Sequence, residues 1–456
     1  DHTVRVLDGR GGEVCRRRAR PTVESLAGVE AAALAGVTAQ TRLEVVIEPT
    51  GSAWLPIAVF FINRGHRVFR VSSAKAADLR RFLSRHAKSN GIDADTLARL
   101  PLLAPDCLHP LELSDTAEAA ALDRRVRACD RLTQQGALHQ RRIKDLVRQL
   151  MPASPLTGEL TKTDLAVLDR WPDPRALLGA GPARLLAVIT KASHGQQSLD
   201  RAEQWRTAAA AAVELYGEHP AMAWADLAAE VATEVRLLRA ISAELSAHAA
   251  ERESRYRQVD PAGLARSLPG LAEVGGPALV ACMGDPARFA TGKKFRSFTG
   301  LAPRASETGE TDRKGQPMSK AGSSLLRTTL VRAADTARKQ DPQLARTYYQ
   351  QMTERGKDHL GALCVVAASL AERAWTVMRR GTPYVICDTD GRPVTPAQAK
   401  AIITERWTVP PEIRARRRSK KTGKAPQKAP EGQCARGSLP LHPTPPRHKR
   451  PVKPSP

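Results

Sequence analysis

The sequence predicts an α/β domain at the N-terminus, a long α-helical linker and a mainly α-helical C-terminal domain. Short β-branched runs alternate with helical patterns over residues 1–105. Two proline-free helical stretches lie within residues 106–262, and a Pro-Gly turn separates helical segments in residues 263–382. Strands that alternate with helices indicate a sheet largely covered by helices. Residues 383–456 are basic and proline-rich, which predicts a tail that is disordered from about residue 414.

The first residues predict a β-hairpin. Residues 3–7 alternate between apolar and polar side chains, Gly9 to Gly12 suits a turn, and residues 13–17 can return as the second strand. Asp8 is interpreted as a turn residue. The elements expected next are a helix over 25–34, a strand over 44–47, a helix over 54–63, a strand over 67–71 and a helix over 75–85.

Two acidic residues stand out in this domain. Glu48 follows the apolar run Val45–Ile47, which predicts a buried strand with a carboxylate at its tip. Asp93 opens a helical pattern that is expected to break at Pro101. Taken alone, Glu48 is typical of an ion-pair partner or a residue near a helix cap, and Asp93 is typical of an acid in the first turn of a helix. Together they favour a metal site, because nucleases hold two Mg²⁺ ions about 3.5–4 Å apart with acids from separate elements.

The linker is dominated by two long helical patterns, residues 116–150 and 227–256, with apolar residues spaced by about 3.5 positions. This spacing predicts coiled-coil-like hairpin arms for dimer contact or for spanning a duplex. A helical bundle packed on the α/β domain explains the pattern equally well. Residues 161–220 predict short helices with Trp171 and Trp205 as core anchors.

The C-terminal domain opens with residues 268–276, where a Pro-Gly turn between helical segments resembles a helix-hairpin-helix. Such a turn points backbone N–H groups at a phosphate, which makes Gly270 a candidate contact. A plain interhelical turn is the alternative.

A polar loop over residues 304–317 carries hydroxyls, glycines and the bases Arg304, Arg313 and Lys314. Ser319 and Lys320 then lead into a helix expected over 324–339. This composition before a helix N-terminus suits a nucleic-acid backbone. The alternative is an ordinary solvated loop.

The overall composition favours a polyanionic partner. Lys and Arg number 71 against 47 Asp and Glu, so the formal charge is +24. The seven cysteines form no CxxC pair, which argues against zinc and suits a reducing cytosol. No apolar run approaches the ~20 residues of a membrane span, so no membrane partner is expected. The chain begins at Asp1 rather than Met, which predicts a start further upstream.

These segments together resemble the DEDD-type transposases of the insertion sequence 110 family. The N-terminal resemblance covers residues 3–100 and includes Glu48-Pro49-Thr50-Gly51 and Lys88-Ser89-Asn90-Gly91-Ile92-Asp93-Ala94. The C-terminal resemblance covers residues 268–380 and includes Pro269-Gly270, Gly284-Asp285, Gly300-Leu301-Ala302-Pro303, Ser319-Lys320-Ala321-Gly322 and Leu326-Arg327.

The resemblance implies an N-terminal RNase H/RuvC-like domain whose four acids bind Mg²⁺. Glu48 fits the family's glutamate and Asp93 its last aspartate, while Asn90 stands where a third acid is expected. An amide ligates through its carbonyl oxygen without adding charge, so metal affinity should fall. The first aspartate is expected in a strand upstream of Asp1, and the chain is therefore interpreted as a fragment.

The resemblance also implies a C-terminal domain that supplies a serine nucleophile. The family's serine aligns with Thr308, and Ser306 lies two positions earlier. Either hydroxyl is a candidate, and Ser319 is a third choice that better suits a helix cap or a phosphate contact. Arg304, Arg313 and Lys314 are expected to stabilise the developing charge.

The sequence as a whole predicts a DNA transposase or recombinase of a mobile element, located in the bacterial cytoplasm at the nucleoid. Its expected partners are the DNA of the element ends and target, a second copy or three further copies of the chain, and, by resemblance, a guide RNA encoded by the element. The alternatives are a RuvC-type structure-selective endonuclease that uses water, and a non-catalytic nucleic-acid-binding remnant.

Overall fold

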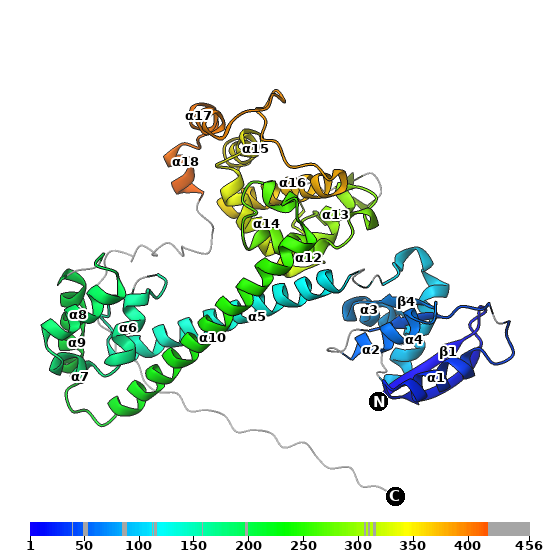
Figure 1. Ribbon diagram of the computed structural model, residues 1–456, viewed down its shortest axis with the longest axis horizontal. Coiled ribbons are helices and arrows are strands. Elements are labelled where there is room, and N and C mark those ends of the chain that lie inside the picture. Colours follow the sequence, from blue (N-terminus) through cyan, green and yellow to red (C-terminus); the bar gives the residue numbers. More distant parts are fainter. Residues whose placement is uncertain are drawn as a thin grey trace, which may run out of the picture. The chain divides into compact units, whose positions relative to one another are not determined.

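The computed structural model divides the chain into two compact units, residues 1–259 and residues 260–456 (Figure 1). Each unit has its own helical core. The structure describes residues 1–38, 40–48, 53–83, 89–111, 113, 116–156, 158–196, 199–304, 307, 308, 311, 312 and 316–417.

The chain opens with the predicted hairpin. Strand β1 (His2–Leu7) pairs antiparallel with β2 (Glu13–Ala19). The Asp8 carboxylate accepts hydrogen bonds from the backbone N–H groups of Arg10 and Gly12, each at 2.8 Å. These bonds stabilise the ionised carboxylate and lower the pKa of Asp8. Asp8 is thus the turn residue that the sequence predicts.

A parallel pair of strands follows. Strand β3 (Glu44–Ile47) pairs in parallel with β4 (Arg67–Arg70), with Glu44 opposite Arg67. Parallel strands need a crossover, and helix α2 (Trp54–Ile62) lies within it. With α1 (Val23–Ala33), these elements enclose a small apolar core formed by Ala19, Leu26, Val29, Ile47, Ala58, Phe60, Phe61 and Val68.

Helix α4 (Asn90–Leu103) connects the two strand pairs, because it packs against both β1 and β3. Helix α3 (Ser73–Leu83) packs on α4 in turn. Among the described residues, each pair forms a separate two-stranded sheet. The α/β character is therefore confirmed, whereas the RuvC-like sheet with a first strand before Asp1 stays a prediction.

The predicted helix break at Pro101 is wrong. Helix α4 continues through Pro101 and ends at Leu103. Proline has no backbone N–H, so Pro101 removes one intrahelical hydrogen bond near the end of the helix. The last turn still closes, because the Ala104 N–H donates to the Leu100 carbonyl at 3.0 Å.

After the one-turn helix η1 (Pro105–Cys107) come the two long helices that the sequence predicts. Helix α5 (Ala117–Leu150) lies beside α10 (Trp224–Val259) along much of its length (Figure 1). Arg125 pairs with Glu251, and His139 pairs with Glu234, so the two helices are antiparallel. The coiled-coil-like spacing therefore reflects pairing within one chain.

Four shorter helices connect these long helices and form a bundle around Trp205. They are α6 (Lys162–Arg170), α7 (Pro174–Gly179), α8 (Pro182–Ala192) and α9 (Leu199–Tyr216). Trp205 is fully buried among Ile143, Leu168 and Val235, and Trp171 is partly buried at the edge of the same core. Both tryptophans are core residues, as the sequence predicts.

The C-terminal unit is mainly helical. Its described elements are α11 (Leu264–Ser267), α12 (Gly275–Met283), η2 (Pro286–Arg288), α13 (Gly292–Thr299), β5 (Glu307–Thr308), β6 (Thr311–Asp312), α14 (Ser324–Ala337), α15 (Pro342–Thr353), α16 (His359–Arg380), α17 (Pro396–Arg406) and α18 (Pro411–Arg416). The unit packs around α16, which contacts α11, α13, α14 and α15.

Helix α16 corrects the expectation that no apolar run reaches the length of a membrane span. By length and composition its 22 residues are sufficient to cross a bilayer. In the structure its apolar face, which includes Leu363, Val366 and Leu370, is buried against the helices of the same unit. The run is that of a core helix.

Residues 383–417 hold two helices where the sequence predicts the start of a tail. The Tyr384 hydroxyl donates to the Asp341 carboxylate at 2.6 Å, and Arg373 donates to the same carboxylate at 3.2 Å. Burial is the main cause that raises the pKa of Tyr384. These bonds tie the segment after α16 to α15. Residues 418–456 lie outside the described residues.

We expect Gly136→Ala to stabilise the protein by about 0.5–1 kcal/mol, since glycine is unfavourable inside a helix. Gly136 lies in α5, and a Cβ atom there would meet Ile241 and Leu238 at 3.7 Å, an ordinary contact distance. Gly181→Ala, in the same unit, should instead destabilise by roughly 1 kcal/mol, because Gly181 has φ +75°. Urea denaturation of the full chain measures both, and a loss of stability in Gly136→Ala contradicts this packing of α5 on α10.

Candidate active site

The two N-terminal acids lie on adjoining elements. Glu48 directly follows β3 and is partly buried. Asp93 lies in the first turn of α4, which Ser89 caps by accepting a hydrogen bond from the Ile92 N–H at 3.2 Å. Helix α4 packs against β3, and the convergence of Glu48 and Asp93 on one cation stays a prediction. Asn90 is the first residue of α4 and is exposed.

Asp93 has a partner that the sequence did not indicate. The Arg80 guanidinium, on α3, donates to the Asp93 carboxylate at 2.9 Å. Their side chains are 20% and 29% exposed, so the ion pair is partly shielded from water. Arg80 therefore competes with any cation for this carboxylate.

The donors seen here make an incomplete metal site. Divalent cations such as Mg²⁺ prefer several oxygen ligands, mainly carboxylates and water. Glu48 and Asp93 supply two carboxylates, Asn90 an amide, and Asp93 is already paired with Arg80. In the part of the chain that the structure describes, no three His, Cys, Asp or Glu side chains gather to hold a metal. The ligand roles of Glu48, Asn90 and Asp93 stay predictions.

The C-terminal candidate residues lie in a segment whose two ends are paired. The Arg304 N–H donates to the Pro317 carbonyl at 2.9 Å, and the Ser319 N–H donates to the Ala302 carbonyl at 2.8 Å. Pro303 and Met318 form a β-bridge between these two bonds. Residues 302–304 and 317–319 thus form the two-stranded base of a hairpin, and β5 and β6 lie between these two segments in the sequence.

Of the two proposed nucleophiles, Thr308 lies in β5, opposite Thr311 of β6. Ser306, Arg313 and Lys314 lie outside the described residues. Arg304 is exposed at the base of the hairpin. The roles of these five residues stay predictions.

Two glycines let the base of this hairpin pack directly on the end of α13. A Cβ atom on Gly322 would lie 2.1 Å from the Phe298 carbonyl oxygen, and one on Gly300 would lie 3.0 Å from the Lys320 carbonyl carbon. Lys320 itself has φ +56°, an unfavourable conformation for a residue with a side chain, at roughly 1–2 kcal/mol. Strain of this kind persists only where surrounding contacts impose it.

Ser319 does not cap the following helix, which corrects one expectation. The N-cap of α14 is Ser323, whose hydroxyl accepts from the Leu326 N–H at 3.2 Å. The Ser319 hydroxyl instead accepts from the Ala321 N–H at 3.4 Å, within its own turn. A phosphate contact by Ser319 or by the exposed Lys320 stays a prediction.

The Pro-Gly turn lies between α11 and α12 as predicted, and α12 begins at Gly275. Gly270 has φ +79°, and a Cβ atom there would lie 2.3 Å from the Ala333 carbonyl oxygen on α14. Glycine is therefore required at this position for packing. Phosphate binding by this turn stays a prediction.

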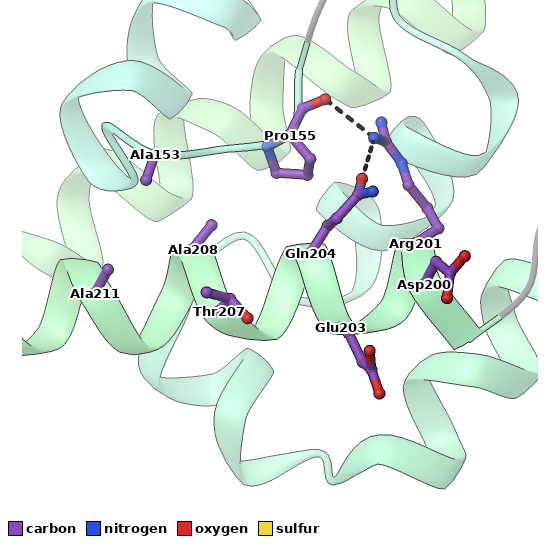
Figure 2. A pocket seen from close by; sticks show the side chains of 9 residues that line it. All are labelled: Ala153, Pro155, Asp200, Arg201, Glu203, Gln204, Thr207, Ala208 and Ala211. Carbon is purple, nitrogen blue, oxygen red and sulfur yellow. Dashed lines mark hydrogen bonds between the residues drawn. The ribbon is translucent and has the colours of Figure 1, made fainter.

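A hollow lies elsewhere in the N-terminal unit. It measures about 740 Å³ and is lined by Ala153, Pro155, Asp200, Arg201, Glu203, Gln204, Thr207, Ala208 and Ala211. Arg201 donates to the Pro155 carbonyl and to Gln204, each at 3.0 Å (Figure 2). None of the predicted site residues lines it.

Comparison with known proteins finds two family matches, one in each half of the chain. A transposase family model of the IS110 DEDD type matches residues 1–152, and the model described as "Transposase IS116/IS110/IS902 family" matches residues 262–350. The chain belongs to the IS110 family of transposases.

Several relatives support the same assignment. A 43.6 kDa protein of insertion element IS110 from Streptomyces coelicolor is 27% identical over 75% of this chain and 83% of its own length. A 42 kDa protein of insertion element IS900 from Mycobacterium paratuberculosis is 27% identical over 53% of this chain and 62% of its own length. The pilin gene-inverting protein of Moraxella lacunata is 22% identical over 44% of this chain and 58% of its own.

We expect the Arg80–Asp93 pair of this IS110-family transposase to be coupled by about 1 kcal/mol, because both side chains are partly shielded from water. A double-mutant cycle with Arg80→Gln and Asp93→Asn measures the coupling in the free energy of unfolding. The exposed pair Arg99–Asp95, at 2.9 Å in the same helix, is the matched control and should give about 0.3–0.5 kcal/mol. A coupling no larger than that of the control contradicts the proposed shielding.

Proposed function

We propose that this protein is a DNA transposase that moves an insertion sequence by cleaving phosphodiester bonds and exchanging DNA strands. The single observation that carries the proposal is the order of the two family matches on one chain, residues 1–152 followed by residues 262–350. A nuclease that uses only the N-terminal acids would not need the C-terminal segment, so the second match is unexplained under that alternative. The relative named for pilin gene inversion also favours recombination over simple cleavage.

The proposed reaction is attack of a C-terminal hydroxyl on a DNA phosphorus. A bond forms between phosphorus and the oxygen of Ser306 or Thr308, and the bond between phosphorus and the leaving deoxyribose oxygen breaks. The proton of the attacking hydroxyl is released to solvent, and the leaving oxygen takes up a proton, so that charge balances. The same exchange in reverse, with another strand end as attacker, rejoins the DNA.

Basic side chains support this chemistry. Arg304, Arg313 and Lys314 are proposed to stabilise the charge that develops on the phosphoryl oxygens. Lys320, Ser319 and the turn at Gly270 are proposed contacts to the DNA backbone. With a formal charge of +24, binding should weaken steeply as salt rises.

The DEDD domain suggests dependence on a divalent metal, for which we propose Mg²⁺. Glu48, Asn90 and Asp93 are the proposed ligands, and at least one more acidic donor is needed beyond them. No chemical step is assigned to the ion, because the described donors do not complete its site.

The proposed partners follow from this function. They are the DNA of the element ends and of the target, and further copies of the chain as a homodimer or homotetramer, since strand exchange needs several active sites. A guide RNA encoded by the element is a further proposal that comes with the family. The proposed location is the bacterial cytoplasm, at the nucleoid.

A non-catalytic DNA-binding remnant is the second candidate, favoured by Asn90 and by the Arg80 pairing of Asp93. It keeps the basic surface but loses cleavage. The two candidates differ in whether the chain forms a covalent product with DNA.

We expect the double variant Ser306→Ala/Thr308→Ala to lose covalent attachment to DNA by at least about 10³-fold, because removing a nucleophile leaves only binding and charge stabilisation. The assay incubates the full chain with Mg²⁺ and a supercoiled plasmid that carries the DNA flanking its own coding region. A denaturing gel then separates protein–DNA adducts. DNA affinity should change less than about 3-fold, since binding depends on phosphate contacts.

Ser319→Ala is the matched control, because Ser319 lies in the same region and is expected to contact phosphate rather than attack it. Cleavage that persists without adduct in the double variant supports the endonuclease alternative. A wild-type chain that binds the plasmid but neither nicks it nor forms an adduct supports the remnant.

A further inference from the structure

We propose that Arg327 is a positioning residue that orients the hydroxyl-bearing hairpin for attack on DNA. This inference rests on the proposed function for the role of Ser306 and Thr308, but the contacts that carry it lie in the described base of the hairpin. In the proposed reaction Arg327 contacts no DNA. It acts through the backbone that holds them.

Arg327 bridges the two ends of the hairpin. Its guanidinium Nη1 donates to the Thr299 carbonyl at 3.4 Å and to the Lys320 carbonyl at 3.2 Å. Thr299 ends α13, shortly before the first strand of the base at residues 302–304, and Lys320 directly follows the second strand at residues 317–319. One side chain therefore adds a bridge between two segments, about twenty positions apart in the sequence, that backbone hydrogen bonds also join.

The position of Arg327 is itself well defined. It lies in the first turn of α14, whose N-cap Ser323 fixes the start of the helix. Leu326 and Leu330, on the neighbouring face, are fully buried. The side chain of Arg327 is half-buried, and Nη1 would lie 2.8 Å from a Cβ atom on Gly300. The guanidinium thus occupies the space that glycine leaves open.

The backbone that Arg327 holds is unfavourable on its own. Lys320 adopts φ +56°, and its N–H donates to the Gly300 carbonyl at 3.1 Å. A planar guanidinium with fixed N–H directions suits two carbonyls better than a flexible ammonium does. Without it, the turn at residues 319–322 can relax, and the hairpin can change its angle to the rest of the unit.

A change in angle affects reaction rate more than binding. Misplacement of a reacting group by about 1 Å can cost on the order of 100-fold in rate. DNA affinity comes mainly from many phosphate contacts and is insensitive to one orientation. A purely structural role predicts the opposite pattern, in which rate, affinity and stability fall together.

The test compares Arg327→Gln and Arg327→Lys with Arg332→Gln in the full chain. Arg332 lies on the exposed side of the same helix and controls for loss of one positive charge. The first readout is the rate of adduct formation with the plasmid described above, together with DNA affinity and the melting temperature. The second readout is tryptic cleavage after Arg304, Arg313 and Lys314 in the native protein.

For Arg327→Gln we expect adduct formation to slow roughly 10–100-fold with DNA affinity within about 3-fold of wild type. Tryptic cleavage within the hairpin should be faster, and Arg327→Lys should restore part of both effects. Arg332→Gln should behave as wild type in every assay. A melting temperature near that of wild type separates positioning from unfolding.

Two results overturn the proposal. In one, Arg327→Gln and Arg332→Gln have the same adduct rate and the same tryptic pattern. In the other, the rate of Arg327→Gln falls only in proportion to affinity and melting temperature. If wild type forms no adduct, the proposed function fails, and the tryptic pattern alone decides whether Arg327 holds the hairpin.

Discussion

The contact between the end of α13 and the turn at residues 319–322 is closer than any side chain permits, and the C-terminal candidate site depends on it. Gly300 and Gly322 make the approach sterically feasible, and backbone hydrogen bonds then join residues 300–304 to residues 317–320. Both strands of the hairpin base are thereby joined by backbone hydrogen bonds to the end of α13. This close contact involves the two glycines, the strained backbone of Lys320 and the bridging side chain of Arg327.

The N-terminal region has a comparable junction in α4. This helix contacts β1 of the hairpin and β3 of the parallel pair, so it joins two small sheets that share no described hydrogen bonds. Its first turn holds Asp93 and its N-terminus carries Asn90. The positions of Asp93 and Asn90 therefore depend on how α4 packs on both sheets as well as on local sequence.

Local patterns predicted much of this fold. The hairpin, the alternation around β3 and β4, and the helices α5 and α10 follow from periodicity, turn residues and caps, which act over a few positions. The pairing of Asp93 with Arg80 was not predictable, because it joins side chains from two helices across an unknown packing angle. Arg327 was visible only as part of a motif, since its backbone partners become neighbours through folding.

The predicted tail illustrates how composition can mislead. Proline-rich sequence suggested a tail from residue 383, disordered from about residue 414, yet Pro396 and Pro411 each occupy the first turn of a helix, where a missing N–H costs nothing. Thr395 and Gln398 form a capping box that a closer reading of the sequence could have found. In α16 a long apolar helix was not predicted from the sequence. Its many alanines make 22 consecutive residues apolar enough to cross a bilayer, although its apolar face is buried in the unit.

The paired base of the hairpin also bears on how such a sequence can diverge. Residues between positions 304 and 317 are connected to the unit through backbone bonds at their two ends, so insertions or deletions between them leave the core intact. At Gly322 even a methyl group collides with a carbonyl oxygen. The length of the hairpin is therefore free to vary, whereas its root at Gly300 and Gly322 is fixed by sterics.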